Sequence, residues 1–304
     1  MRGAADGTGS AVKSVILLGA SSMLGQEIAR QLATRDIDVI TAGRRPDSDI
    51  VIDLASDVPP EWAGNCSADV LIHCASAFGD DSEQGIRQNI RANVGGCIHA
   101  LEIAKRAGVQ KIIYAGSISS DSALELGMPL NSYGFTKAEA ERLLEWGINR
   151  TGGTFCSLRL PQLWDTEGAC CAHQPWFGRI IAYASRGQLL NMPSSDGPRN
   201  FMHVSDAAQL FIRAGESALV GTHAVCYPVD IDMAELAHHA YRIFGQGGGI
   251  AIDSNKKPFR KMRFPHEEHV FGALNYYPQI SPEQGLSLIH EAGTANRFGP
   301  VDVL

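Results

Sequence analysis

The sequence predicts an α/β fold with a doubly wound parallel sheet, followed by a smaller, irregular C-terminal domain. Up to about residue 160, short apolar runs alternate with segments of helical periodicity. A glycine-containing turn directly follows the first apolar run, and the regular alternation breaks up after Pro161. Such alternation is typical of a parallel sheet with helices on both of its faces.

The helices and strands predicted for the first half follow from the periodicity of apolar residues and from the length of each segment. Strands are expected over residues 14–19, 38–42, 49–52, 69–74, 111–115 and 154–160. Helices are expected over residues 24–33, 85–107 and 131–150. The second of these helices ends before Gly108, which is a helix-stop signal.

The second half is less regular. Residues 163–178 and 191–200 are rich in loop-forming residues, whereas 201–214 is expected to lead from a short strand or turn into a helix. Helices are expected over 233–244 and 282–292. We therefore expect a first domain over 1–165 and a second, ligand-closing domain over 166–304, with about 201–227 returning to the first.

Composition excludes several classes of protein. The net charge of −7 argues against nucleic-acid binding, and no apolar run is long enough for a membrane span or a signal segment. The seven cysteines show no C-x-x-C pair or zinc spacing, which is typical of reduced thiols in the cytoplasm; a secreted, disulfide-bonded protein is the less favoured alternative. Residues 1–12 are small and polar and are expected to form a frayed tail.

The turn after the first strand reads Gly19-Ala20-Ser21-Ser22-Met23-Leu24-Gly25. Gly19 would permit the tight turn, Gly25 would let the helix pack closely, and the helix N-terminus would hold a pyrophosphate. Ser22 stands where such loops usually have a glycine. The turn predicts a Rossmann-type dinucleotide site, with candidate ligands Gly19, Ser21, Ser22, Met23, Leu24 and Gly25.

The end of the second strand bears on the choice of cofactor. The run Thr41-Ala42-Gly43-Arg44-Arg45 has no acidic residue to bind a ribose 2′-hydroxyl. A guanidinium such as that of Arg44 can instead pair with a 2′-phosphate. NADP(H) is therefore favoured and NAD(H) remains possible; the alternative is that both arginines are simply solvated.

Tyr133 and Lys137 are four residues apart on a predicted helix, so they share one face. A phenol with a pKa of about 10 needs help to exchange a proton at neutral pH, and a nearby ammonium would lower that pKa. Ser117 follows the strand over 111–115 and could hydrogen-bond a substrate carbonyl beside the phenol. Ser117, Tyr133 and Lys137 are the candidate catalytic residues.

These residues, with several further segments, resemble the extended short-chain dehydrogenase/reductase family, the NAD-dependent epimerase/dehydratase group. The similar segments are the glycine turn, Asp53-Leu54, His73-Cys74-Ala75-Ser76, Asn93-Val94-Gly95-Gly96, Ala107-Gly108-Val109-Gln110-Lys111, Leu158-Arg159-Leu160-Pro161 and Arg199-Asn200-Phe201-Met202-His203-Val204-Ser205-Asp206. The resemblance covers about residues 14–218.

The resemblance implies roles for particular residues. Cofactor contacts would come from Asp53, Leu54, Cys74, Ala75, Asn93, Tyr133, Lys137, Leu160 and Pro161. Substrate contacts would come from Ser76, Ser117, Gln162 and Arg199, with Arg199 on a substrate diphosphate. Members of the family often act on nucleotide-linked sugars, and many form homodimers through two long helices, which here would be those over about 85–107 and 132–150.

Three departures from the family pattern bear on function. Ser22 replaces the middle glycine, and Gln162 stands where many members carry an asparagine. Ser117 is followed by Ile118-Ser119 instead of the Asp-Glu pair of dehydratases, which argues against a 4,6-dehydratase. We predict an NADPH-dependent ketoreductase acting on a nucleotide-linked keto-sugar. The alternatives are a nucleotide-sugar epimerase that holds NAD tightly and a non-catalytic NADP-sensing protein.

No metal site is expected from the sequence. The run His266-Glu267-Glu268-His269 spaces its histidines three apart instead of four, and it is interpreted as an exposed charged turn.

Overall fold

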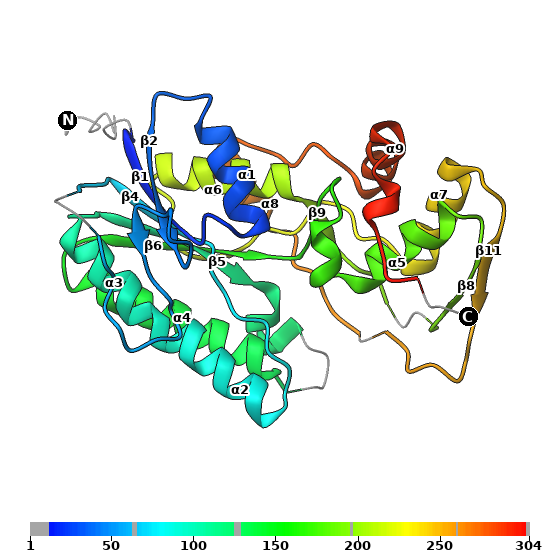
Figure 1. The fold of residues 1–304 in the computed structure, drawn as a ribbon, viewed down its shortest axis with the longest axis horizontal. Coiled ribbons are helices and arrows are strands. Elements are labelled where there is room, and N and C mark those ends of the chain that lie inside the picture. The colour runs from blue at the N-terminus through cyan, green and yellow to red at the C-terminus, as the bar shows by residue number, and fades with distance from the viewer. Residues whose placement is uncertain (1–11, 63–65, 125–128, 195–196, 260, 302–304) are drawn as a thin grey trace, which may run out of the picture.

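The computed structural model describes residues 12–62, 66–124, 129–194, 197–259 and 261–301. Except for Val12, the predicted frayed tail lies outside the described residues. Figure 1 shows a large lobe built around an extended sheet and a smaller lobe that contains the C-terminus.

The described residues of the large lobe form a seven-stranded parallel sheet in the order β10-β6-β5-β4-β1-β2-β3. The strands are β1 (Ser14–Leu18), β2 (Asp38–Gly43), β3 (Ile50–Val51), β4 (Val70–His73), β5 (Lys111–Ser117), β6 (Thr154–Leu160) and β10 (Gly221–Ala224). The strand order reverses between β1 and β4, so the predicted doubly wound sheet is confirmed.

Helices cover both faces of this sheet (Figure 1). On one face lie α1 (Met23–Leu32), α6 (Val204–Glu216) and α8 (Glu268–Leu274); on the other lie α2 (Glu83–Asn89), α3 (Gly96–Arg106) and α4 (Ser132–Asn149). Leu17 of β1 packs into the first core, and its neighbours Ile16 and Leu18 pack into the second. Because both faces are buried, the strand is apolar at all four buried positions from Val15 to Leu18 instead of alternating.

The predicted helix over 85–107 is helical throughout but not uniform. A π-helical turn, Ile90–Gly95, joins α2 to α3. Such turns are often found at functional sites, and this one contains the buried Asn93. Asn89, at the end of α2, is fully buried as well.

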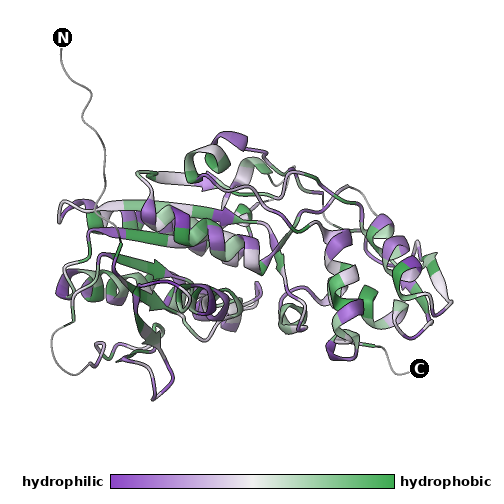
Figure 2. Ribbon diagram, turned by 90° about the horizontal axis from the view of Figure 1, so that it is seen from above, coloured by the Kyte–Doolittle hydropathy of each residue, from purple (hydrophilic) through white to green (hydrophobic). Residues whose placement is uncertain are grey.

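The small lobe has its own apolar core and two pairs of parallel strands. The strand pairs are β7 (Gln162–Trp164) with β9 (Phe201–His203) and β8 (Leu189–Met192) with β11 (Gly249–Ile252). Its helices are α5 (Pro175–Ala184), α7 (Met233–Phe244) and α9 (Pro282–Ala292). Figure 2 shows hydrophobic residues along the strands of the large sheet, while the helices present both hydrophilic and hydrophobic faces.

Two predictions for the second half are wrong. The segment over 163–178 was expected to be irregular, but it includes the end of β7, and α5 begins at Pro175 because proline is well suited to the first turn of a helix. The charged run at 266–269 is not a simple turn, since Glu267 is the N-cap of α8. Among the described residues, none of the helices has the length and apolarity needed to cross a membrane.

Candidate active site

Helix α4 places Tyr133 and Lys137 against strand β5. The side chain of Asn131 caps the helix by accepting a hydrogen bond of 2.8 Å from the Gly134 N–H. Tyr133, in the first turn, hydrogen-bonds to Ser117 at the end of β5. One turn later, Lys137 Nζ lies 4.0 Å from the centroid of the Tyr114 ring on the same strand. Both side chains therefore face β5.

The Tyr133 hydroxyl belongs to a cluster of three hydroxyl groups, the others being those of Ser117 and Ser76. Burial raises the pKa of Tyr133 to about 12, and the hydrogen bonds to the two serines oppose this rise. The expectation that Lys137 would lower this pKa is wrong for this arrangement, because the ammonium lies against Tyr114 and burial dominates. The phenol is consequently protonated at neutral pH and can donate a proton.

Lys137 is almost fully buried, and burial lowers its pKa to about 8, against the opposing influence of Glu141. Glu141 in turn accepts hydrogen bonds of 2.7 Å from Ser157 Oγ and from Arg159 Nη2. Arg159 lies 3.5 Å from Asp121 as well. The sequence interpretation missed Glu141, although its spacing of four residues from Lys137 places it on the same helix face.

The loop after β4 is braced by Asn93. Its side-chain oxygen accepts hydrogen bonds from the Ala77 N–H (2.7 Å) and from Ser76 Oγ (3.1 Å). Its side-chain nitrogen donates to the Ala77 carbonyl (3.1 Å) and to Thr136 Oγ1 (3.2 Å). Asn93 was predicted to contact the cofactor. In the structure its hydrogen bonds connect Ser76 to Thr136 of α4 and so fix the position of Ser76 relative to that helix.

A stack of three rings covers the phenol. The Phe78 ring lies 4.9 Å from that of Tyr133 and 4.2 Å from that of His173, with interplanar angles of 21° and 29°. His173 comes from the small lobe, so the stack spans the two lobes at the phenol. The sequence interpretation named neither Phe78 nor His173, because nothing in a single sequence pairs two rings so far apart along the chain.

The glycine turn has the close contacts that a phosphate-binding turn requires. Gly19 has a φ of +90°, and a Cβ there would lie 2.5 Å from the Ala75 nitrogen. A Cβ on Gly25 would lie 2.2 Å from the Gly19 carbonyl oxygen. Ser22 has an ordinary φ of −71°, and its hydroxyl accepts a hydrogen bond of 3.0 Å from the Gly25 N–H. Ser22 therefore caps α1, and this position needs no glycine.

The other predicted cofactor residues lie at the carboxyl edge of the sheet. In chain order they are Arg44 after β2, Asp53 and Leu54 after β3, Cys74 and Ala75 after β4, and Leu160 and Pro161 at the end of β6. Ligands bind at this edge in open α/β sheets. Lys137 Nζ, buried and donating no hydrogen bond among the described residues, would suit a ribose diol. These residues fit a bound nicotinamide dinucleotide.

The predicted substrate residues Gln162 and Arg199 line one cavity of about 360 Å³ in the small lobe. Trp176, Phe177 and Phe259 supply aromatic walls, and the Arg199 guanidinium carbon lies 5.6 Å from the centroid of the Phe259 ring. Gln162 Nε2 donates a hydrogen bond of 2.6 Å to Gln174 Oε1. Gln174, which lines the cavity, directly follows His173 of the ring stack, so the cavity and the stack share this segment of the small lobe.

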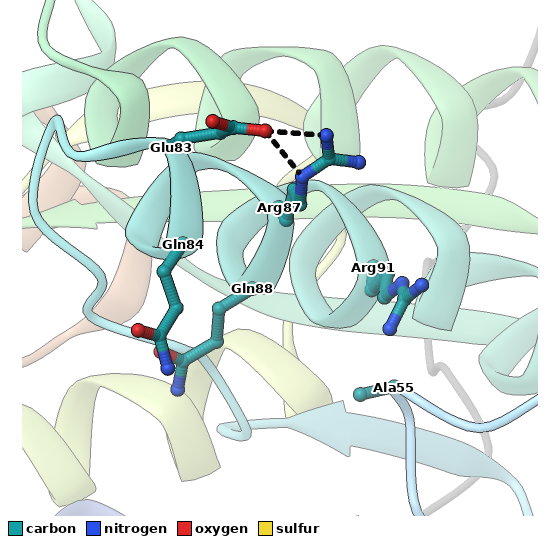
Figure 3. A pocket seen from close by; sticks show the side chains of 6 residues that line it. All are labelled: Ala55, Glu83, Gln84, Arg87, Gln88 and Arg91. Carbon is teal, nitrogen blue, oxygen red and sulfur yellow. Dashed lines mark hydrogen bonds and ion pairs between the residues drawn. The ribbon is translucent and has the colours of Figure 1, made fainter.

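A larger hollow, of about 570 Å³, lies elsewhere, along α2. Figure 3 shows Gln84 and Gln88 side by side and Glu83 paired with Arg87 at this surface. None of Ser117, Tyr133 or Lys137 lines it. The cavity next to the ring stack is therefore the better candidate for the substrate.

Comparison with known proteins now identifies the family. Residues 15–226 match the family described as "NAD dependent epimerase/dehydratase family". The chain belongs to this family. The predicted family, and with it an NAD(P)-dependent enzyme of the short-chain dehydrogenase/reductase type, is confirmed. No curated protein matches the chain.

Solved structures of similar fold include RMD from Pseudomonas aeruginosa complexed with NADPH (TM-score 0.75, 18% identity, covering 93% of this epimerase/dehydratase-family chain and 99% of that chain). UDP-N-acetylglucosamine 4-epimerase from Bacillus cereus is similar as well, with a TM-score of 0.75 and 18% identity, over 92% of this chain and 99% of that chain. A third is a UDP-glucuronic acid 4-epimerase mutant from Bacillus cereus, in complex with UDP-4-deoxy-4-fluoro-glucuronic acid and NAD. Its TM-score is 0.71 at 16% identity, over 93% of this chain and 99% of that chain. At these identities the likeness supports the fold.

Proposed function

We propose that this enzyme uses NADPH to reduce a keto group on a nucleotide-linked sugar. The observation that carries the proposal is the placement of the Tyr133 hydroxyl, which is hydrogen-bonded to Ser117 and Ser76 and covered by the Phe78 ring, where burial raises its pKa. Reduction of a ketone consumes a proton at the carbonyl oxygen, and a phenol that stays protonated at neutral pH is suited to supply it.

The residues divide the reaction among them. When bound, the nicotinamide supplies the hydride. Ser117 would hydrogen-bond the carbonyl oxygen and orient it, while Tyr133 donates the proton. Lys137 would hold the ribose and keep a positive charge near the site while it is protonated. The ring stack would exclude water during the transfer.

The groups around the end of β2 support NADP(H) over NAD(H). Asp49, the carboxylate near this strand end, accepts hydrogen bonds from the backbone N–H and hydroxyl of Thr41, both 2.8 Å. Arg45 pairs with Asp47. Arg44 is exposed and, among the described residues, makes no ion pair, so it remains available to a 2′-phosphate.

The small lobe supports a nucleotide-linked substrate, and we propose that it is the substrate-binding domain. The cavity combines Arg199, suited to a diphosphate, with aromatic rings suited to stack on a base or a sugar. Gln162 Oε1 is buried without a hydrogen-bond partner among the described residues, so it can accept one from a ligand hydroxyl or amide.

A nucleotide-sugar epimerase that retains NAD is the second candidate. It is favoured by the fold likeness to two structures whose names describe them as 4-epimerases. An epimerase must take up and return the same proton, which demands that the Tyr133 pKa fall when ligands bind. A reductase has no such demand in its forward direction.

We also propose a homodimer in the cytoplasm. The helices predicted to pair expose large apolar side chains, namely Ile90, Ile98, Phe135 and Trp146. Exposed apolar side chains on neighbouring helices suit a helix–helix interface. The seven cysteines are all free thiols, which suits a reducing compartment.

The test is cofactor identification by mass on purified protein, followed by a panel of nucleotide-linked keto-sugars with absorbance at 340 nm as the readout. The reductase proposal predicts oxidation of added NADPH and release of NADP. Tightly retained NAD that never exchanges, with interconversion of two sugar epimers, would favour the epimerase. Cofactor binding without turnover of any substrate would favour the non-catalytic alternative.

The cofactor preference is tested by Arg44→Ala. This substitution should raise the KM for NADPH about tenfold and leave the KM for NADH within about twofold of wild type.

A further inference from the structure

Three potential metal ligands converge at the edge of the large sheet, outside the proposed active site. His223 lies on the edge strand β10, Glu267 is the N-cap of α8, and His269 lies in the first turn of that helix. One ligand atom from each lies within 4.8 Å of the other two. No sequence motif signals this group, because its first member comes from a separate strand.

His223 is held in the orientation and tautomer that a metal ligand needs. Its Nε2 lies 2.8 Å from the Val220 carbonyl oxygen, so Nε2 carries the proton and donates it there. Nδ1 is then left with a lone pair, 3.8 Å from Glu267 Oε2. Metal-binding histidines usually donate their second N–H to a carbonyl or carboxylate in this way.

The charges around these three residues leave the Glu267 carboxylate able to bind a cation. The nearby guanidinium of Arg159 is bound by Glu141 at 2.7 Å and lies 3.5 Å from Asp121. Among the described residues, Glu267 has no ion pair with a lysine or an arginine, and its carboxylate lies 3.8 Å from Nδ1 of the neutral His223 imidazole. The two imidazole rings lie 6.3 Å apart at 75°, which leaves space between them for an ion.

We propose that His223 Nδ1, the Glu267 carboxylate and the His269 imidazole bind one zinc-class divalent ion, with water as the fourth ligand. Two imidazoles and one carboxylate suit zinc, at distances of about 2.0–2.2 Å. Small side-chain rotations, easiest for the exposed His269, would bring the three atoms to those distances. The hard cations Mg²⁺ and Ca²⁺ prefer all-oxygen sites and would bind poorly. This proposal replaces the expectation of no metal.

The ion would join the edge strand to a segment that reaches the active-site loop. Just before Glu267, Phe264 packs in a small core with Ile118 and Leu124, which follow Ser117. The Arg263 N–H donates a hydrogen bond of 3.1 Å to the Leu124 carbonyl. Metal binding would therefore stabilise β10 against α8 and restrain the segment that contacts this loop.

The test uses the untagged full-length protein after chelator treatment. Equilibrium dialysis against ZnCl₂, with bound metal measured by mass spectrometry, should give about one zinc per chain with micromolar or tighter affinity. Cobalt(II) should give the visible absorption of a tetrahedral N/O site. Zinc should raise the Tm by a few degrees, whereas Mg²⁺ should not.

Variants decide whether these three residues form the site. His223→Gln, Glu267→Gln and His269→Ala should each weaken zinc binding by about tenfold or more, whereas His238→Ala, an exposed histidine on α7, should leave it unchanged. His269 is exposed, so its variant remains informative if His223→Gln fails to fold. Zinc bound equally well by the triple variant, or no zinc bound by folded wild type, would overturn the proposal.

Discussion

The hydrogen-bonded residues next to Tyr133 and the cavity of the small lobe hold their polar side chains in different ways. Around the large sheet, Glu141 and Asn93 have their hydrogen bonds satisfied within the protein. In the small lobe, Gln162 lines a cavity with one polar atom unpaired, beside Arg199 and aromatic walls. The contrast indicates that the chemistry is placed by a closed network, while substrate selection lies in an adaptable cavity. Substitutions in this network should change kcat, and those in the cavity should change the KM for the sugar substrate.

Lys137→Met gives the largest effect among the predictions for the closed network. Activity should fall about 10²–10³-fold, since the charge near the cofactor is lost. Stability should nevertheless rise at neutral pH, because lowering the Lys137 pKa from 10.5 to about 8 corresponds to about 3 kcal/mol of destabilisation. Chemical denaturation and steady-state kinetics on the same preparation measure both.

Lys111→Met is the matched control for that substitution. Lys111 is also buried, but its Nζ donates hydrogen bonds of 2.7 and 2.6 Å to the carbonyls of Ala214 and Ser217. Its replacement removes both hydrogen bonds, although the Ala214 carbonyl still accepts one of 3.1 Å from Ser217 Oγ, and should lower the free energy of unfolding by about 1–3 kcal/mol. Equal destabilisation by both substitutions would contradict the distinction drawn between the two lysines.

Arg199→Gln tests the adaptable cavity. The KM for a nucleotide-linked substrate should rise about 10–100-fold with kcat changed little, because a charge-assisted contact to a diphosphate is lost. The exposed Arg242→Gln serves as control. A fall in kcat at unchanged KM would place Arg199 in the chemistry instead and would break the comparison.

The pH dependence reports the charge on Lys137. Its pKa of about 8 lies below the ordinary value, so the ammonium is present below pH 8 and is lost above it. The kcat/KM for reduction should be flat below pH 8 and fall about tenfold per pH unit above it. The same lowered pKa means that the unfolded chain binds the extra proton between pH 8 and 10.5, so this residue adds stability as the pH rises through that window. A rate that climbs above pH 8 would point to a different titrating group.

Phe78→Ala tests the role of the ring stack at the boundary between the two lobes. Removing the middle ring of the stack should lower kcat by about 3–10-fold through access of water to the phenol. Leu189→Ala, which truncates an exposed apolar side chain outside the proposed dimer interface, is the control. If Phe78→Ala changes only the KM, the ring belongs to substrate binding.

Much of the large lobe could be predicted from sequence because each signal is local. The run Val70-Leu71-Ile72 is apolar throughout since β4 is buried on both faces, and Asn131 predicts the start of α4 as its N-cap. The four-residue spacing of Tyr133 and Lys137 correctly placed both on one face. The pKa shift of Tyr133 could not be predicted, because it depends on burial in the folded chain, where the Phe78 ring stacks on the phenol.

The small lobe resisted prediction for a physical reason. Strands β8 and β11 pair across more than fifty residues, and each is only four residues long, too short to stand out alone. Pro175 lies in a segment expected to be irregular, although it begins α5. The link between Gln162 and Gln174 and the convergence of His223 on Glu267 are products of tertiary packing.

Single-turnover reduction by the Tyr133→Phe variant tests the central claim most directly. NADPH binding, followed by fluorescence, should stay within about twofold of wild type, while hydride transfer at 340 nm should slow by about 10²–10⁴-fold. Tyr277→Phe, an exposed tyrosine, should behave as wild type. If the folded Tyr133→Phe variant instead reduces the substrate at near the wild-type rate, the phenol is not the proton donor and the account is contradicted.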